Sequence, residues 1–259
     1  MSSEKNFDGL YARLDDLKRC AGRGDLGISA FLSPRELYFA ENYLRRTGCD
    51  FISFGGYSGA ERKRIYILPE YMAELSDTEG FSDFGFSTEL SVIKVNASGF
   101  VELSHRAFMG SLLSLGIERE VIGDILIVDG GALVVCDGKM SGFLLENWQR
   151  VGKDKVKLEL CTLPKDFCAH REYQALSDTV ASPRLDCVVA ALCSLSRERA
   201  RDAVESGLVE LNYELEERAD REVLKDSILS VRGFGKFRIL SLSDKTRKGR
   251  YRLSAEKYL

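Results

Sequence analysis

The chain has 259 residues, of which 44% are apolar, and a net charge of −3. This length predicts two or three globular domains, and the apolar content is sufficient for a core in each. No apolar run approaches the roughly 18 residues of a membrane span. The first residues also lack the basic and apolar stretches of an export signal, so we expect a cytoplasmic protein with no membrane partner.

Cysteines and histidines do not indicate a metal centre. The seven cysteines never form a C-x-x-C pair, and most lie in apolar stretches, which predicts reduced and buried thiols. His105 and His170 are the only histidines, so a zinc site would need a scattered set of ligands. We therefore expect neither a metal nor a cofactor.

Residues 1–75 predict an N-terminal α/β unit. Apolar residues recur at helical spacing near the start, and Ser33 to Glu36 supplies an N-cap, a proline in the first turn and a capping-box glutamate. Strands are expected at residues 50–54 and 62–68. The acidic, glycine-bearing segment 76–89 is predicted to be a linker.

Three glycines precede a basic run in GGYSGAERKR, residues 55–64. A phosphate-binding loop would need Gly-Lys-Ser or Gly-Lys-Thr before a helix, whereas a strand follows here. If Ile65 and Ile67 face the core, strand alternation turns their neighbours outward, Tyr66 among them. The candidates for nucleic-acid contact are then Arg62, Lys63 and Arg64. An ordinary solvated hairpin is the alternative.

Residues 90–165 predict the element order strand, helix, strand, strand, helix, strand. This is the ferredoxin-like plan, shared by RNA-recognition motif (RRM) domains. The two strands that stack bases in an RRM contain no aromatic residue here, so we expect packing or helix-side contacts instead. His105 and Arg106 follow the helix cap Ser104 and are candidates for phosphate contact, with a structural histidine as the alternative. Residues 166–180 are predicted to be a second linker.

Residues 181–259 form the most basic part of the chain. Residues 1–182 hold 21 Lys and Arg against 27 Asp and Glu, whereas residues 226–259 hold nine against three. Such a local surplus attracts polyanions whatever the total charge. In the C-terminal strands, Phe237 and Ile239 alternate with Lys236 and Arg238, which predicts one apolar and one basic face. Protection of a sheet edge is the alternative role of these cations.

Two short helices begin this C-terminal part. Ser196 is predicted to cap the second helix, which ends at Gly207, with Ala200, Ala203 and Val204 as its buried stripe. The arginines on the rim of this stripe are Arg197, Arg199 and Arg201. They could reach phosphates, although Arg201 could instead pair with Glu198 and Glu205.

This segment resembles the alpha-L RNA-binding domain first seen in ribosomal protein S-four. The resemblance rests on Arg184-Leu185-Asp186, Ser196-Arg197, Arg199-Ala200, Gly207, Val209 and Asn212. It implies that the residues facing structured RNA are Arg184, Ser196, Arg197, Arg199, Arg201 and Gly207. Arg-Leu-Asp also resembles the catalytic segment of pseudouridine synthases, but an apolar helix face follows Asp186 here. We therefore expect Asp186 to orient Arg184, and an RNA-modifying enzyme remains the alternative function.

FLSPRE, GGYSGAERKR, SHRAFMGSLLSLGIEREVIGDI and SVRGFGKFRI together resemble the YlmH family over almost the whole chain. The resemblance implies an α+β protein with an N-terminal α/β unit, an RRM-like unit and an alpha-L domain at residues 181–259. It also implies a monomer that binds ribosomal RNA and/or tRNA without catalysis, on large ribosomal subunits that still carry peptidyl-tRNA. This interpretation expects the C-terminal arginines to lie clear of neighbouring carboxylates.

Overall fold

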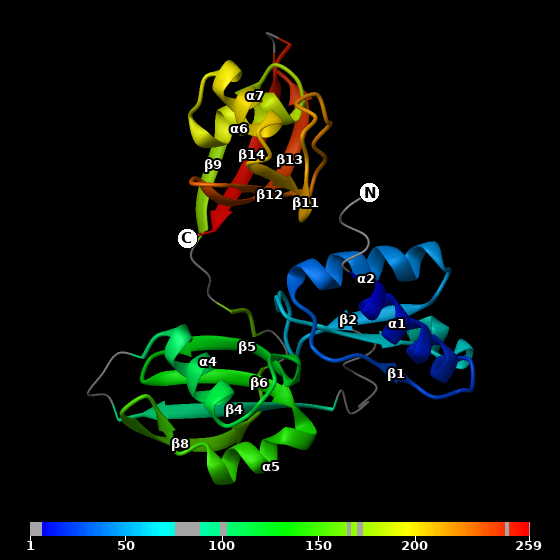
Figure 1. Cartoon of the computed structure of the whole chain (residues 1–259), viewed down its shortest axis with the longest axis vertical. Helices are drawn as coiled ribbons and strands as arrows, with labels where there is room; N and C mark the ends of the chain where they lie inside the picture. Colours follow the sequence, from blue (N-terminus) through cyan, green and yellow to red (C-terminus); the bar gives the residue numbers. More distant parts are fainter. Residues whose placement is uncertain are drawn as a thin grey trace. The chain divides into compact units, whose positions relative to one another are not determined.

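The computed structural model describes residues 7–75, 89–98, 103–164, 167–169, 173–246 and 249–258. The chain is α+β and divides into two compact units, residues 1–169 and 170–259 (Figure 1). Three units were expected. The division at residues 76–89 stays a prediction, because residues 76–88 lie outside the described part of the chain.

The first part of the N-terminal unit packs two helices on a small antiparallel sheet. Its strand order is β1-β3-β2. The predicted capping box is confirmed, since the Ser33 side chain and the Glu36 side chain each accept the other's backbone N–H. The elements are α1 (Asp8–Ala21), β1 (Gly27–Ile28), α2 (Pro34–Arg46), β2 (Phe51–Phe54), β3 (Arg64–Ile67) and the 3-10 helix η2 (Glu70–Leu75).

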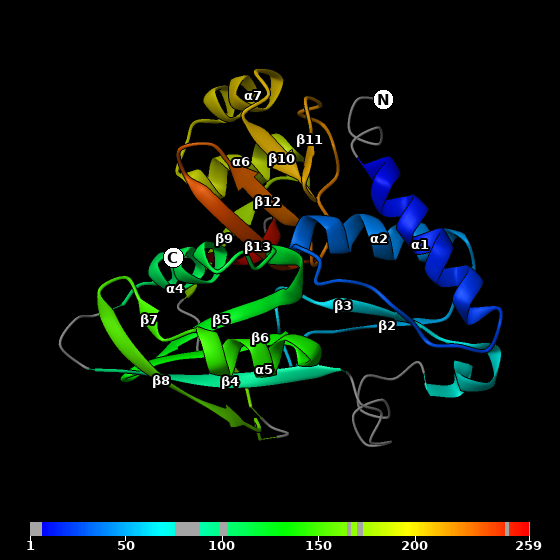
Figure 2. The same ribbon diagram turned by 60° about the horizontal axis from the view of Figure 1, so that its bottom comes forward.

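The second part of this unit has the predicted ferredoxin-like arrangement. Its antiparallel strands lie in the order β5-β6-β4-β8-β7, and α4 and α5 cover one face through Phe108, Leu112 and Leu144 (Figure 2). The elements are β4 (Leu90–Ala97), α4 (His105–Ser114), η3 (Arg119–Val121), β5 (Ile122–Val128), β6 (Gly131–Asp137), α5 (Gly138–Asn147), β7 (Arg150–Val151) and β8 (Asp154–Cys161).

The opposite face of the ferredoxin-like sheet packs against the first part of the chain. Val135 of β6 is fully buried in a cluster with Phe31, Tyr57 and Ala60, and Phe167 packs against the same cluster. An RRM presents this face to unpaired bases. Here the middle of the sheet is covered by protein, which gives a physical reason for the absence of aromatic residues from the two strands.

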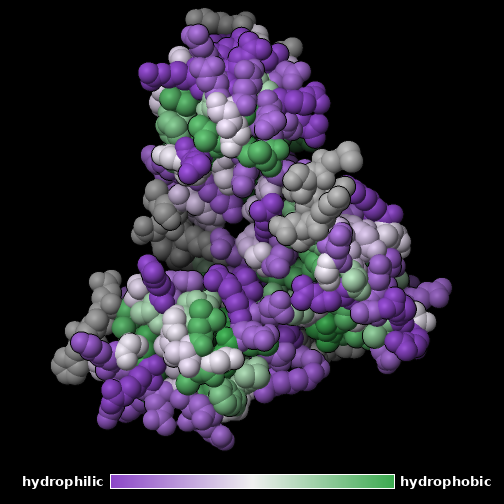
Figure 3. Space-filling model, viewed as in Figure 1, coloured by the Kyte–Doolittle hydropathy of each residue, from purple (hydrophilic) through white to green (hydrophobic). Residues whose placement is uncertain are grey.

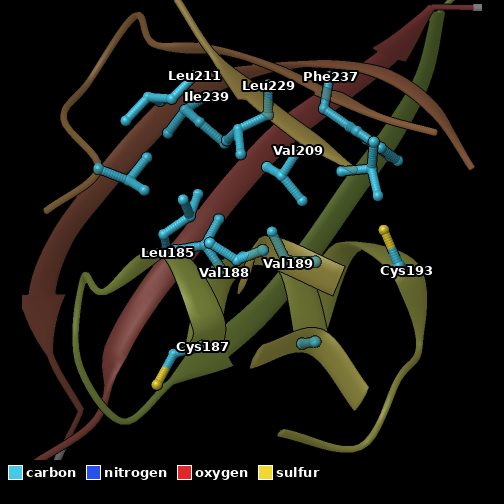
Figure 4. Close-up of a cluster of buried hydrophobic side chains, with 14 of the residues drawn as sticks. Leu185, Cys187, Val188, Val189, Cys193, Val209, Leu211, Leu229, Phe237 and Ile239 are labelled. Atoms are coloured by element: carbon cyan, nitrogen blue, oxygen red, sulfur yellow. The ribbon is translucent and has the colours of Figure 1, made fainter. Parts of the chain in front are cut away.

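The C-terminal unit places two helices on one face of a six-stranded antiparallel sheet with the order β11-β10-β12-β13-β14-β9. Val188 and Val189 of the first helix point toward Val209, Leu229 and Phe237 of the sheet (Figure 4). The elements are β9 (Tyr173–Val180), α6 (Leu185–Cys193), α7 (Arg197–Glu205), β10 (Val209–Leu211), β11 (Glu214–Leu215), β12 (Ile228–Val231), β13 (Gly235–Lys245) and β14 (Tyr251–Tyr258).

Residues 173–180 differ from the sequence prediction. They form β9 rather than the end of a linker, and they pair with β14 over its whole length, from Tyr251 opposite Val180 to Tyr258 opposite Tyr173. The prediction was wrong because most residues of β9 are exposed, so its sequence lacks the apolar alternation that marks a half-buried strand. The backbone pairing of an edge strand needs no such pattern.

All seven cysteines carry free thiols. Cys136, Cys187 and Cys193 are buried as predicted, whereas Cys168 is exposed. Burial raises the pKa of Cys136 to about 12 and that of Cys193 to about 11, so both stay protonated. Among the described residues, no group of His, Cys, Asp and Glu is arranged to hold a metal ion, and no helix has the length and apolar character needed to cross a bilayer.

Candidate nucleic-acid interface

The centre of the candidate interface is a buried carboxylate in the C-terminal unit. Asp186 lies in the first turn of α6 and is 2% exposed. It accepts two hydrogen bonds of 3.1 Å from Nε and Nη2 of Arg184, the N-cap residue of the same helix, and one of 3.3 Å from Nε of Arg197 at the start of α7. The expectation that Asp186 orients Arg184 is confirmed, and Arg197 is a second partner that the sequence did not predict.

Asp186 remains ionised despite its burial. Burial alone would raise the pKa of this carboxyl, but hydrogen bonds from Arg184, Cys187 and Arg197 outweigh that effect and hold the pKa below its ordinary value of 3.8. The same contact with Asp186 raises the pKa of Arg184. One negative charge therefore fixes two positive ones, and the local sum stays positive.

The arginine side chains remain partly open to solvent. The exposed fraction is 37% for the Arg184 side chain and 61% for Arg197. A guanidinium carries five N–H donors, and Asp186 uses two of those on Arg184 and one on Arg197. The other donors have no partner in the described part of the chain, so the ion pairs orient these arginines and leave edges that can bind a phosphate.

Helix α7 carries the two remaining arginines. Ser196 caps it, accepting from the backbone N–H of Arg199 at 3.2 Å, and the buried stripe contains Ala200 and Val204 as predicted. Arg201 pairs with Glu205 at 2.8 Å, which confirms the alternative of a pair within the helix. Arg199 is exposed, and no carboxylate of the described residues lies within 4.0 Å of it.

The expectation that these arginines lie clear of carboxylates is wrong for three of them. Arg184, Arg197 and Arg201 each have an acidic partner. They are nevertheless grouped, because Arg201 is within electrostatic reach of both Arg184 and Asp186. We call Arg184, Arg197, Arg199 and Arg201, together with Asp186, the arginine cluster.

The chain after α7 turns sharply beside the arginine cluster. Gly207 adopts a φ of +68°, in the left-handed region that favours glycine. Asn212 and Tyr213 also have positive φ values, of 51° and 65°, and form the turn between β10 and β11. The Asn212 side chain accepts from the backbone N–H of Ile228 at 2.9 Å. These contacts fix the segment that the alpha-L resemblance places against RNA.

The basic face predicted for the C-terminal strands is present in β13. Phe237 and Ile239 are buried, whereas Arg238 is exposed and makes only a long contact of 3.4 Å with Asp226. Lys236 is half-buried, and its Nζ lies 4.9 Å from the centre of the Tyr213 ring and 5.1 Å from that of Tyr258. These cation–π contacts hold Lys236 in place on the outer side of the sheet.

The predicted outward direction of Arg62, Arg64 and Tyr66 is wrong. All residues of β3 are buried. Arg64 forms an ion pair with Asp137 and lies 4.9 Å from the centre of the Phe31 ring. The alternation rule failed because β3 is the central strand of its sheet and is covered on both sides.

Arg62 is buried and stabilises the fold instead of contributing to the surface. It is 9% exposed and donates to the backbone carbonyls of Ile122, Phe31 and Arg119 at 2.9, 3.1 and 3.0 Å. Lys63 is half-buried, and its backbone pairs with that of Leu32. Of the predicted Arg-Lys-Arg contact, only Lys63 retains a partly exposed side chain.

The glycine stretch 55–62 connects the first part of the N-terminal unit to the ferredoxin-like sheet. Asp124 of β5 accepts from the Tyr57 hydroxyl at 2.5 Å and from the backbone N–H groups of Glu61 and Arg62 at 2.8 and 3.0 Å. A Cβ on Gly55 would lie 2.3 Å from the carbonyl oxygen of Arg62. The backbone thus approaches itself and the ferredoxin-like sheet, which explains the glycines without a phosphate.

His105 and Arg106 occupy the exposed first turn of α4, as predicted. Ser104 caps this helix and accepts from the backbone N–H of Ala107 at 3.4 Å. Neither residue has an ion-pair partner among the described residues. In Figure 3 hydrophilic residues predominate on the visible face of each unit, and apolar patches lie among these residues.

Comparison with known proteins identifies the family. The chain is 31% identical over 231 residues to the protein named "Ribosome-associated protein quality control protein P2" of Bacillus subtilis, covering 89% of this chain and 86% of that protein. Residues 82–165 match the family described as "Putative RNA-binding domain in YlmH". The chain belongs to the YlmH family. A solved structure, "Cell division protein ylmH from Streptococcus pneumoniae", is 21% identical and covers 62% of this chain and 92% of its own, with a TM-score of 0.49.

The segment matched to the YlmH RNA-binding domain is the ferredoxin-like part of the N-terminal unit, from the start of β4 to the end of β8. The sequence did not predict two contacts of this YlmH chain that organise the candidate surfaces. One joins Asp124 to the glycine loop, and the other joins Arg197, itself a predicted site residue, to Asp186. Neither contact has a local sequence signal, because each joins residues that lie apart in the chain.

Proposed function

We propose that this chain binds structured ribosomal RNA on the large ribosomal subunit in the cytoplasm, within reach of tRNA or peptidyl-tRNA, and that it does so without catalysis. Membership of the YlmH family supports a role in RNA binding. The name of the Bacillus subtilis relative supports association with the ribosome. The observation that carries the proposal is the buried Asp186, which fixes Arg184 and Arg197 with part of each guanidinium exposed.

This arrangement suits a folded polyanion. A guanidinium held in one orientation loses less conformational entropy on binding a phosphate than a freely rotating side chain does. Arg199 and Arg201 lie about 200° apart around α7, so the helix carries an arginine on each rim of its buried stripe. No aromatic ring belongs to the arginine cluster, so the contacts expected are with phosphates and not with unpaired bases.

The geometry disfavours the alternative of an RNA-modifying enzyme of the pseudouridine synthase type. Such an enzyme would need the aspartate of Arg-Leu-Asp to reach a substrate. Asp186 is 2% exposed and is occupied by Arg184, Arg197 and the backbone N–H of Cys187 at 2.9 Å. It is therefore a positioning group for the arginines.

The proposal is tested by co-sedimentation with purified bacterial large ribosomal subunits. Arg197→Glu combined with Arg201→Glu is expected to abolish co-sedimentation, because it reverses two charges of the arginine cluster. Arg45→Glu is a matched control: Arg45 is 60% exposed, like Arg201, and pairs with Glu41 at i,i+4 spacing within α2. The control should bind like the wild type.

Salt dependence gives a second readout. If about five phosphates are neutralised, the affinity should fall a few hundredfold between 50 and 200 mM salt. A binding constant that does not change with salt, or a double variant that still co-sediments, would rule out the arginine cluster as the contact. To test catalysis, ribosomal RNA incubated with the protein is examined for altered nucleosides by mass spectrometry, and any stoichiometric product would restore the enzyme alternative.

A further inference from the structure

We propose that the helix side of the ferredoxin-like sheet, at the end where α4 meets the β7–β8 hairpin, is a second RNA-backbone site. The inference rests on the proposed function and adds a site in the other unit. Its starting point is the burial of Val135, Phe31 and Tyr57 described above, which removes the centre of the usual RRM surface from contact with RNA. Any RNA contact of this segment must use another surface.

An open groove of about 520 Å³ lies beside α4. Helix α4 packs next to β7 (Figure 2). This volume is within the range of ligand sites. Arg106 and Arg150 both line the groove, and neither side chain has an ion-pair or hydrogen-bond partner among the described residues. No Asp or Glu is among the remaining lining residues, most of which are small or polar: Gly110, Ser111, Ser114, Asn147, Gln149 and Gly152.

The β7–β8 hairpin continues the positive charge from the groove. Within residues 150–157, the basic residues are Arg150, Lys153, Lys155 and Lys157, and all four are exposed. The one acidic residue, Asp154, is occupied by Ser98, accepting from its backbone N–H at 3.0 Å and from its hydroxyl. The hairpin thus has a charge of +3 in a stretch of the chain, residues 1–182, whose charge is −6.

One pair in the hairpin costs the fold stability. Arg150 and Lys155 lie directly opposite each other in the register of β7 and β8. Like charges at such a position repel each other. A bound anion would offset this repulsion, and neither residue has an acidic partner within 4.0 Å in the described part of the chain.

The chemistry of the site favours the backbone of RNA over its bases. The aromatic residue of the groove, Trp148, is 2% exposed, and its indole N–H donates to the Ser111 hydroxyl at 2.9 Å, so it offers no open ring for stacking. Arginine and lysine side chains without an exposed aromatic neighbour contact phosphates and give affinity without sequence preference.

Two glycines provide a matched test. Gly110 lines the groove and Gly142 does not, yet both are exposed, both lie in helices, and a Cβ at either position would meet no atom within 4 Å. Gly110→Glu and Gly142→Glu therefore change charge and helix propensity alike. With protein-free large-subunit ribosomal RNA as the probe, in a filter-binding assay with the full chain, Gly110→Glu should weaken binding about tenfold and Gly142→Glu should leave it unchanged.

A second variant separates binding from folding. Lys155→Glu replaces the repulsive pair with Arg150 by an attractive one, so the melting temperature should stay the same or rise. Its affinity for the same RNA should fall about tenfold. A structural role alone would change the melting temperature and leave the affinity as it is.

The groove variants and the arginine-cluster variant test the two sites separately. If Gly110→Glu and Lys155→Glu bind like the wild type while Arg197→Glu with Arg201→Glu does not, the second site is wrong and the proposed function stands. If only the groove variants lose affinity, the second site stands and the arginine cluster is not the contact. If the groove variants bind RNA normally but no longer co-sediment with large subunits, the surface binds an acidic protein segment, which overturns the RNA site.

Discussion

Arg184 holds Asp186 through two parallel hydrogen bonds of 3.1 Å, one from Nε and one from Nη2. This fork geometry fixes the guanidinium plane at the entrance of α6. Because the carboxylate is buried and the guanidinium is partly exposed, Arg184 is held in one orientation with an open edge, and together with Arg197 the group carries a net positive charge. Arg197 donates to Oδ2 of the same carboxylate, the oxygen that also accepts from Nη2 of Arg184.

Asp186→Asn should therefore weaken RNA binding, although it removes a negative charge from an RNA-binding surface. Simple electrostatics predicts tighter binding, whereas loss of the anchor predicts an affinity lower by about tenfold, or about 1.4 kcal/mol. The free energy of unfolding should fall by about 1–3 kcal/mol, because hydrogen bonds to a charged group are lost. The loss stays in this range because the exposed arginines can hydrogen-bond to water instead. Filter binding and thermal melting measure the two effects, and an increased affinity would contradict the anchoring role.

Arg62→Met should destabilise the N-terminal unit and leave RNA affinity unchanged. The variant leaves three backbone carbonyls without their donor, at a cost of about 1–3 kcal/mol for each that remains buried. Lys63→Met, next in the chain, is the control and should change stability by less than about 1 kcal/mol. Urea unfolding and RNA binding of the pair distinguish a structural arginine from one that contacts RNA.

Gly55→Ala should destabilise the same unit. The added Cβ would lie 2.3 Å from the Arg62 carbonyl oxygen and 2.6 Å from the Ala60 Cβ, so the backbone must shift, which typically costs about 1–3 kcal/mol. Gly9→Ala in α1 meets no atom within 4 Å and should stabilise the protein by up to about 1 kcal/mol. The melting temperature is expected to fall for Gly55→Ala and to rise for Gly9→Ala. If both variants shift it by the same amount, the loop accommodates the added Cβ without cost.

Acid should destabilise both units. The pKa of Asp186 is lowered, as described above. Burial alone would raise the pKa of Asp137. Hydrogen bonds from the Arg64 side chain and the Lys139 backbone outweigh burial, so the pKa of Asp137 is also lowered. A carboxyl whose folded-state pKa is depressed stabilises the fold fully above its ordinary value, here 3.8, and this stabilisation is lost as the pH falls through the folded value.

Calorimetric melting between pH 7 and pH 3 checks this. The melting temperature should stay level down to about pH 4 and then decline. Asp186→Asn should decline less steeply than the wild type, because the variant no longer has that carboxyl to protonate. Parallel curves for the two proteins would show that Asp186 does not contribute to the acid response.

Local signals were sufficient for much of the fold. The capping box at Ser33, the buried stripe of α7 and the strand and helix order of the ferredoxin-like part are encoded within short segments, and the structure confirms them. Side-chain direction at Arg62 and Arg64 was not predictable in this way. It depends on a second layer of protein covering β3. Phe31, Ile122 and Asp137 belong to that layer, and none of them is a near neighbour of Arg62 or Arg64 in the sequence.

The arginine cluster shows the same limit. Helical spacing indicated correctly that Arg201 could pair with Glu205, and Arg-Leu-Asp indicated that Asp186 orients Arg184. The contact of Arg197 with Asp186 depends on how α6 and α7 pack, which no pattern in either helix specifies. The resemblance gave the residues of the site, while the structure gave their partners.

The hydrogen bonds between Asp124 and the glycine loop limit where the chain can be cut to obtain a stable fragment. A recombinant fragment covering only residues 82–165 would lack Tyr57, Glu61 and Arg62, leaving the Asp124 carboxylate without three of its donors. It would also expose Val135 to water. Such a fragment would be prone to aggregate, and the shortest piece that retains this packing extends upstream to Phe31 and downstream to Ala169.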